Sequence, residues 1–156
     1  MGAVPDVRLV GYWSDEPLYQ GAMEAGDIAF RPDGTGWTYW SRAGGSFFVC
    51  RFRWHTIGGR RLTLDLHQWL SGTWEPAGDT TQHLVGDQAT CGEQLVLAYK
   101  IAAGRDILNR PATLLELDQR VSVGTIGDRF ARIRELAEDE HDPTTRFSRP
   151  PGPAGK

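Results

Sequence analysis

Apolar and polar residues alternate along most of the chain, and glycine-rich turns interrupt the alternation. The clearest stretch is 47–55, where Phe48, Cys50, Phe52 and Trp54 fall on one side of an extended backbone. Successive side chains of a β-strand point to opposite faces, so this period of two predicts a half-buried strand. The pattern is typical of an antiparallel β protein.

The same criterion predicts about eight strands, most of them separated by short turns. Nine segments are candidates for these strands: 7–14, 27–31, 37–41, 47–55, 62–67, 73–75, 80–85, 95–101 and 114–123, of which 73–75 and 80–85 are the weakest. Pro32-Asp33-Gly34 and Gly58-Gly59 supply residues that tight turns need. Consecutive strands with short turns favour a meander, and closing it removes the exposed edges of a flat sheet. We therefore expect an antiparallel meander β-barrel, with a β-sandwich as the less favoured alternative.

A helical period replaces the alternation near the end of the chain. Thr125 and Asp128 have the spacing of a capping box, and Phe130, Ile133 and Ala137 lie on one helical stripe. This predicts one C-terminal α-helix, about 127–140, packed on the outside of the barrel.

The domain organisation follows from the same pass along the chain. A length of 156 residues suits one compact core. Residues 142–156 hold four of the nine prolines and show no periodic apolar pattern, which predicts a flexible tail. We expect one domain over 1–141, the barrel with its helix, followed by a proline-rich tail over 142–156.

Composition excludes several classes of partner from the interpretation. The formal net charge is −3, and Arg60-Arg61 is the one adjacent basic pair, so we expect no nucleic-acid partner. No apolar run approaches the roughly 20 residues of a membrane span, so we expect no membrane partner. The first residues lack the pattern of a secretion signal, and two cysteines cannot make a disulfide framework. These features indicate a cytoplasmic protein.

Three short patterns resemble the lipocalin-like (calycin) β-barrel domains of bacteria. Gly11-Tyr12-Trp13 on the first strand is similar to their Gly-x-Trp start, and 30–36 followed by Trp37 is similar to their Asp-Gly-Thr-Gly hairpin. Phe52-Arg53-Trp54 with the following Gly-Gly turn fits the same meander, and so does a terminal helix. The resemblance covers 7–140 and implies an internal cavity that takes a hydrophobic small molecule. It implies no catalytic residues.

The residues that most often carry chemistry have simpler interpretations here. Asp65, His67 and His83 could share a sheet face as metal ligands, but a solvated face explains them better, so we expect no metal. Cys50 shares its face with aromatic residues and is interpreted as a core residue. Its pairing with Cys91 depends on geometry that sequence does not fix. The glycine pairs join strand to strand and form no phosphate loop, so we expect no cofactor.

The aromatic residues are the main candidates for a binding site. Indole and phenol groups on inward positions can line an apolar cavity and offer polar contacts to a ligand. The expected ligand-binding residues are Trp13, Trp37, Tyr39, Trp54 and Tyr99, with Gln119 as a polar orienting group on the last strand. The same aromatics could instead fill the barrel completely.

Three functions are consistent with this pattern. The first is a barrel that binds a small apolar or amphipathic molecule. The second is a cofactor-independent enzyme that uses the same cavity to position a substrate. The third is a filled barrel that serves as a protein–protein interaction domain, including a homodimer, through outer aromatics such as Trp40, Trp69 and Trp74. We rank them in that order.

Overall fold

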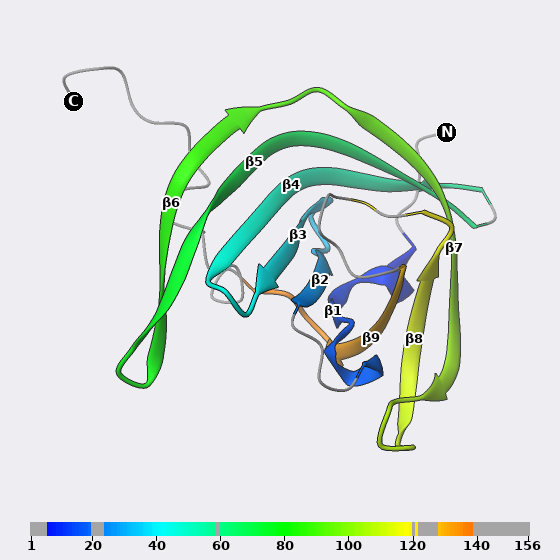
Figure 1. The fold of residues 1–156 in the computed structure, drawn as a ribbon. Helices are drawn as coiled ribbons and strands as arrows, with labels where there is room; N and C mark the ends of the chain where they lie inside the picture. The colour runs from blue at the N-terminus through cyan, green and yellow to red at the C-terminus, as the bar shows by residue number, and fades with distance from the viewer. Residues whose placement is uncertain (1–5, 20–23, 59, 120, 122–127, 139–156) are drawn as a thin grey trace.

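The computed structural model describes residues 6–19, 24–58, 60–119, 121 and 128–138. Within these residues the chain forms a nine-stranded antiparallel sheet and two short 3₁₀ turns (Figure 1). The turns are η1 (Val7–Leu9) and η2 (Glu16–Leu18). The strands are β1 (Gly11–Ser14), β2 (Glu24–Phe30), β3 (Thr35–Arg42), β4 (Ser46–Ile57), β5 (Arg61–Ala77), β6 (Thr80–Thr90), β7 (Gln94–Arg105), β8 (Pro111–Leu117) and β9 (Arg129–Arg134).

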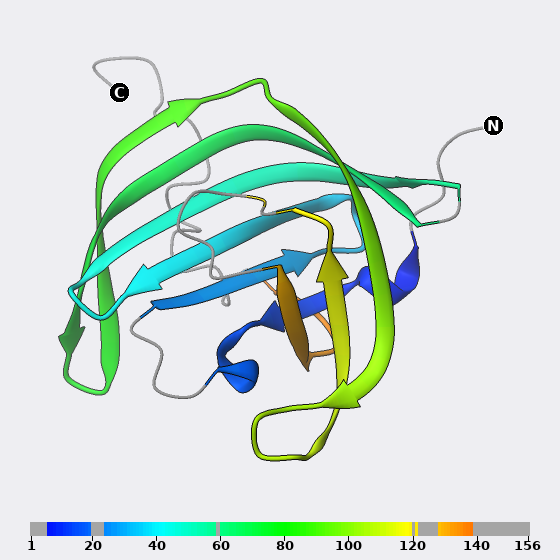
Figure 2. The same ribbon diagram turned by 45° about the vertical axis from the view of Figure 1, so that its right-hand side comes forward.

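The sheet closes on itself. Neighbours are hydrogen-bonded in the order β4-β3-β2-β1-β9-β8-β7-β5, and β4 also pairs with β5, which completes the ring. Figure 2 shows the same ring from a second direction. The prediction of an all-β chain whose antiparallel sheet closes into a barrel is therefore confirmed.

The long strand β5 explains how nine strands make this ring. Residues 61–65 of β5 pair with 94–98 of β7, and residues 68–77 pair with 80–90 of β6. Thus β6 and β7 follow one another along the same edge of β5. The β5–β6 hairpin extends away from β7 and β8, at the left of Figure 1. The predicted segments 62–67 and 73–75 belong to this single strand.

The inner face of the ring is apolar. Cross-strand partners share a face, as Phe52 does with Leu66 and Tyr99 with Leu117. The buried residues of this inner cluster are Leu9, Trp13, Ile28, Phe30, Cys50, Phe52, Trp54, Leu62, Leu64, Leu66, Leu97, Tyr99, Leu115, Leu117, Val121 and Phe130. Burial of these side chains stabilises the closed sheet.

A second apolar cluster lies on the outer face of the same strands. Its buried residues, the outer cluster, are Tyr12, Ala29, Trp37, Phe47, Val49, Leu70 and Ala137. Tyr12 and Trp37 alternate with inward-facing neighbours, and their rings meet edge to face with centroids 6.2 Å apart. The wall from β1 to β5 is therefore buried on both faces.

The predicted C-terminal helix is wrong. Residues 129–134 form β9, and no helix of a full turn's length or more beyond η1 and η2 is found in the described part of the chain. β9 fills the gap between β8 and β1: Phe130 lies opposite Leu115 and enters the inner cluster. Main-chain bonds to two neighbouring strands outweigh the weak helical stripe in the sequence. Thr125 of the expected capping box, and the expected tail over 142–156, lie outside the described residues.

Among the residues that the structure describes, no helix has the length and apolar character needed to cross a bilayer.

Candidate functional site

The aromatic residues expected to line a cavity lie on two different faces of the sheet. Trp13, Trp54 and Tyr99 belong to the inner cluster and are at most 4% exposed. Both indole N–H groups donate to main-chain carbonyls of the protein, at 2.9 and 3.1 Å. The Tyr99 hydroxyl donates to the carboxylate of Asp6 at 2.6 Å. The polar groups of these three side chains are therefore already engaged within the protein.

The other expected ligand-binding residues are separate from this group. Trp37 lies in the outer cluster, and Tyr39 packs against that cluster. Gln119 lies beyond the end of β8, exposed, and its amide donates to the carbonyl of Val96 at 3.2 Å. The structure thus brings together Trp13, Trp54 and Tyr99, but not the whole predicted set.

The histidines and acids considered as metal ligands have other partners. His83 Nε2 lies 2.8 Å from the hydroxyl of Tyr39, and Asp65 accepts a hydrogen bond from Gln94 at 2.8 Å. His67 is exposed on β5. Within the part of the chain that the structure describes, no group of three or more His, Cys, Asp or Glu side chains could hold a metal ion.

The two cysteines are free thiols. Cys50 is buried in the inner cluster, and Cys91 packs against the same cluster from the segment between β6 and β7. Burial raises the pKa of the Cys50 thiol to about 12, and the neighbouring Cys91 adds to this shift. Cys50 therefore stays protonated near neutral pH, which fits a core residue rather than a nucleophile.

A pair of buried carboxyl groups lies where β1 ends beside β2. Asp15 is 1% exposed and accepts a hydrogen bond from the amide of Gly26 at 2.8 Å. Asp27 accepts one from the hydroxyl of Tyr12 at 2.6 Å. Burial raises the pKa of Asp15 to about 7 and that of Asp27 to about 6. These carboxyl groups therefore titrate near neutral pH, and they add a pH-dependent element to the fold.

The seam between β8 and β9 is the place where the barrel wall opens. The ladder between the two strands ends at the pair Leu114–Ala131. Beyond that pair, 132–134 pair with β1, whereas 111–113 stay paired with β7. The two strands therefore diverge toward one end of the barrel, as Figure 1 shows.

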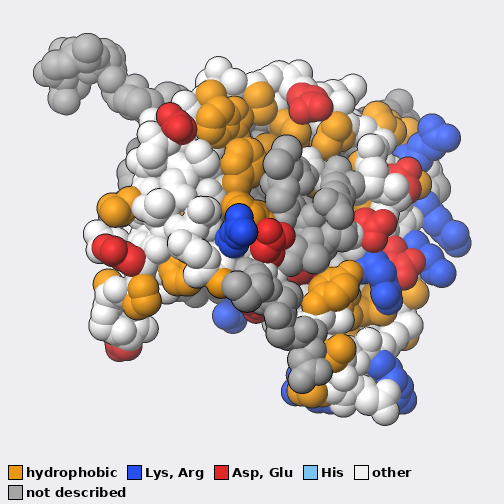
Figure 3. All heavy atoms as spheres, viewed as in Figure 1, with side chains coloured by type: hydrophobic (Ala, Val, Ile, Leu, Met, Phe, Trp, Pro, Cys, Tyr) orange, Lys and Arg blue, Asp and Glu red, His pale blue; other side chains and the backbone are white. Residues whose placement is uncertain are grey.

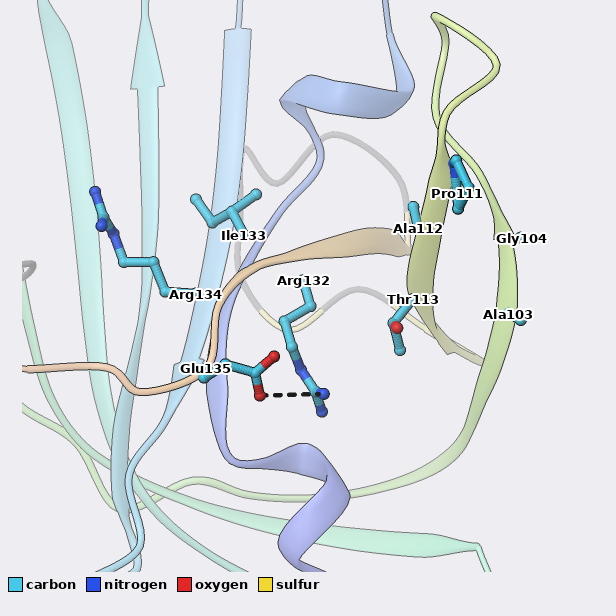
Figure 4. Close-up of a pocket in the computed structure, with 9 residues that line it drawn as sticks. All are labelled: Ala103, Gly104, Pro111, Ala112, Thr113, Arg132, Ile133, Arg134 and Glu135. Atoms are coloured by element: carbon cyan, nitrogen blue, oxygen red, sulfur yellow. Dashed lines mark ion pairs between the residues drawn. The ribbon is translucent and has the colours of Figure 1, made fainter.

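A pocket of about 450 Å³ occupies this divergence. The β7–β8 side supplies small and apolar residues, and the β9 side supplies three charged residues and Ile133 (Figure 4). The lining residues are Ala103, Gly104, Pro111, Ala112 and Thr113 on the first side, and Arg132, Ile133, Arg134 and Glu135 on the second. Its position matches the mouth of a β-barrel, where ligand sites are common.

Arg132 is one of the three charged residues that line this pocket. Its guanidinium carbon lies over the Trp13 ring, 4.7 Å from the ring centroid, which is a cation–π contact. One terminal nitrogen donates to the carbonyl of Arg8, and the other lies 3.9 Å from the carboxylate of Glu135. The Nε–H is buried and finds no acceptor among the described residues.

The main chain that accepts from Arg132 belongs to a hydrogen-bonded turn. Arg8 in η1 pairs with Asp6 at 2.8 Å, and Asp6 also receives the hydroxyl of Tyr99. Hydrogen bonding from Arg8 lowers the pKa of Asp6 to about 2, so this carboxylate stays charged near neutral pH. Through the Arg8 carbonyl, the pocket arginine is tied to this anchored turn. The guanidinium is thus held in place before any ligand arrives.

The arrangement favours recognition of an anion. A guanidinium with an unsatisfied N–H matches a carboxylate or a phosphate, and a partly buried site strengthens the interaction. The opposite wall offers apolar surface and the hydroxyl of Thr113.

The sequence alone did not single out Arg132, because the segment 129–134 was interpreted as a helix. A usable signal was present: Phe130 and Arg132 alternate with Ala131 and Ile133, as in a strand. Because β9 closes the barrel, this alternation places Phe130 in the inner cluster. Arg132, two residues later, lies on the same inner face.

Comparison of the sequence with models of known protein families, and with curated proteins, finds no match.

Proposed function

We propose that the protein is a small-molecule-binding β-barrel that takes an amphipathic carboxylate in the pocket between β8 and β9. The observation that carries the proposal is the pre-positioned Arg132, whose buried Nε–H lacks an acceptor among the described residues. Leaving such a donor unpaired costs free energy, about 1–3 kcal/mol, and an anionic ligand would recover it.

The pocket supports a ligand with both an anionic and an apolar part. A volume of about 450 Å³ lies inside the usual range for small-molecule sites. Ala103, Pro111 and Ala112 offer apolar surface to a hydrocarbon portion, while Arg132 offers the charged contact. This division suits a medium-chain fatty acid or a carboxylate of similar shape.

Glu135 is a weak competitor for the Arg132 guanidinium, at a terminal nitrogen and not at the Nε–H. Its carboxylate lies 3.9 Å from the Arg132 guanidinium, too long for a strong pair, and its side chain is 89% exposed. An exposed ion pair of this length contributes little, so Glu135 can leave at low cost. A ligand carboxylate at the Nε–H would lie closer to the guanidinium than Glu135 does.

Isothermal titration calorimetry with decanoate tests the proposal. The wild-type protein should bind one decanoate, and Arg132→Met should weaken the affinity by about tenfold or more because the charge-assisted bond is lost. Arg134→Met is the matched control: it removes the same charge from the same pocket, and its affinity should change by less than about threefold.

Two further comparisons separate the anionic contact from the apolar one. Decanol, which keeps the chain but lacks the charge, should bind the wild type weakly and should not distinguish Arg132→Met from it. Glu135→Gln should bind decanoate more tightly than the wild type, because it removes the competing carboxylate. No binding of decanoate to the wild type, or equal loss in the two arginine variants, would contradict the proposal.

A further inference from the structure

The turn of the β7–β8 hairpin carries two adjacent exposed apolar residues. Ile107 is 49% exposed and Leu108 is 66% exposed. This turn lies directly beside the pocket, because Gly104 and Pro111 on either side of it line the pocket wall. Large apolar side chains that project from a turn stay exposed to solvent in the folded protein, so another surface can bury them.

Hydrogen bonds within the turn hold the main chain that carries Ile107 and Leu108. The carboxylate of Asp106 accepts hydrogen bonds from the amides of Leu108 and Arg110, both at 2.9 Å. Asn109 adopts a left-handed conformation with φ of 62°, and its carbonyl accepts from Arg105 at 2.9 Å. The main chain next to the pocket is tied to η2 as well, through the amide of Ile107 and the carbonyl of Pro17 at 2.8 Å. Little conformational entropy remains to be lost when the tip meets a partner.

The turn itself carries two arginines against one acid, although the whole chain is acidic and the neighbouring η2 adds Glu16. Arg105 and Arg110 flank the apolar pair, and the one acid among them, Asp106, is bonded to Arg110 at 2.9 Å. Arg132 and Arg134 follow in the adjoining pocket against a single acid, Glu135. In Figure 3 apolar and basic side chains lie side by side at the lower right, where Figure 1 places this hairpin.

We propose that the β7–β8 turn docks the protein on an anionic lipid surface, with Ile107 and Leu108 inserted at the level of the headgroups. Apolar residues flanked by arginines fit the boundary between acyl chains and anionic headgroups. The docked orientation places the pocket next to the membrane, so an amphipathic carboxylate can pass between bilayer and protein. The passage of a carboxylate between bilayer and pocket rests on the proposed function, but the docking itself does not depend on that function.

The sequence-based expectation of no membrane partner considered only spanning segments. A two-residue tip produces no long apolar run, and its exposure becomes visible only when the hairpin is folded.

Co-sedimentation with large vesicles tests the docking. The full-length protein is mixed with vesicles of phosphatidylcholine alone, or of phosphatidylcholine with phosphatidylglycerol, and the bound fraction is measured at low and high salt. We expect binding to the anionic vesicles that weakens as salt screens the arginines. The double variant Ile107→Ser, Leu108→Ser should lower the partition coefficient by about tenfold.

Val96→Ser is the matched control. Val96 is as exposed as Ile107, at 49%, but it lies on the outer face of β7 next to β5. This variant should partition within about twofold of the wild type. Arg105→Gln should reduce the preference for anionic vesicles by several-fold and leave residual binding to neutral ones unchanged.

The outcomes distinguish this inference from the proposed function. Titration of decanoate without vesicles should give the same affinity for the double Ser variant and the wild type. No vesicle binding by the wild type, or equal binding by the double variant, would overturn the docking even if decanoate binds. Vesicle binding that needs Ile107 and Leu108, without any decanoate binding, would support the docking and overturn the proposed function.

Discussion

The β4–β5 wall and the β8–β9 seam belong to the same barrel but are built in opposite ways. Every residue of β4 has a partner on β5, and the wall carries buried apolar side chains on both faces. The seam has pairs from Glu116–Arg129 to Leu114–Ala131 and then divides. With the proposed function, stability and binding belong to different parts of one sheet. We expect most of the stability to come from the wall, where apolar side chains are buried on both faces.

The largest effect is expected from a cavity in the wall. Phe52 is fully buried between β3 and β5 and contacts the ring of Phe30, with centroids 5.7 Å apart. Phe52→Ala should lower the free energy of unfolding by about 4 kcal/mol, measured by chemical denaturation. If this variant lost less than a Leu114→Ala variant at the seam, the assignment of stability to the wall would be wrong.

A slightly smaller loss is expected from overpacking the wall. A Cβ atom at Gly36 would clash with the Ala29 carbonyl and lie 2.6 Å from the Phe52 ring. Gly36→Ala should therefore cost about 3 kcal/mol of unfolding free energy. Gly44→Ala is the control, since a Cβ there meets nothing within 4 Å, and its stability should stay close to that of the wild type. Equal stability of the two variants would contradict the packing described for the wall.

The buried carboxyl pair predicts how stability changes with pH. The pKa of Asp15 rises from 3.8 to about 7 on folding, and that of Asp27 from 3.8 to about 6. Between about pH 4 and pH 7 the folded state holds protons that the unfolded state has released. Within that window these two groups make the free energy of unfolding fall as the pH rises. Asp27→Asn removes one of these groups.

The Asp27→Asn variant should be more stable than the wild type by about 3 kcal/mol at pH 8, and the difference should vanish near pH 4. Denaturant titrations at both pH values measure this. Asp87→Asn, at an exposed position on β6, serves as the control, and its stability difference from the wild type should not change in this way between the two pH values. A stability gain for Asp27→Asn that stayed constant with pH would argue against a buried, titrating carboxyl group.

The smallest effect on stability is expected at the seam itself. Ile133 lines the pocket and is 46% exposed, so Ile133→Ala should change the free energy of unfolding by less than about 0.5 kcal/mol. The same variant should weaken decanoate binding by about threefold, because apolar contact with the chain is lost. Loss of stability without any change in decanoate affinity would reverse the roles given to seam and wall.

Alternation in the sequence was sufficient to predict most strands and the closed sheet. It failed at 129–134 because Phe130, Ile133 and Ala137 also satisfy a helical stripe, and only the gap between β1 and β8 decides between the two. Such a gap is a property of the assembled sheet. Local sequence does not contain it.

The candidate site was harder to predict than the fold. Trp13, Trp54 and Tyr99 were correctly placed on inward positions, but Trp37 and Tyr39 were grouped with them by residue type. The pairing of Gly36 with Phe52 shows that the two outer residues have the opposite parity. Arg132 was missed because the divergence of β8 from β9 depends on where a three-pair ladder stops, which no local pattern encodes.

The central claim is that the Nε–H of Arg132 receives an anionic ligand. Solution NMR of protein labelled with ¹⁵N at arginine Nε tests it most directly, with the Arg132 signal assigned from its absence in Arg132→Lys. On addition of decanoate we expect a downfield shift of the Arg132 Nε–H signal and its protection from solvent exchange, with the Arg134 signal unchanged. An unchanged Arg132 signal at saturating decanoate would contradict the account.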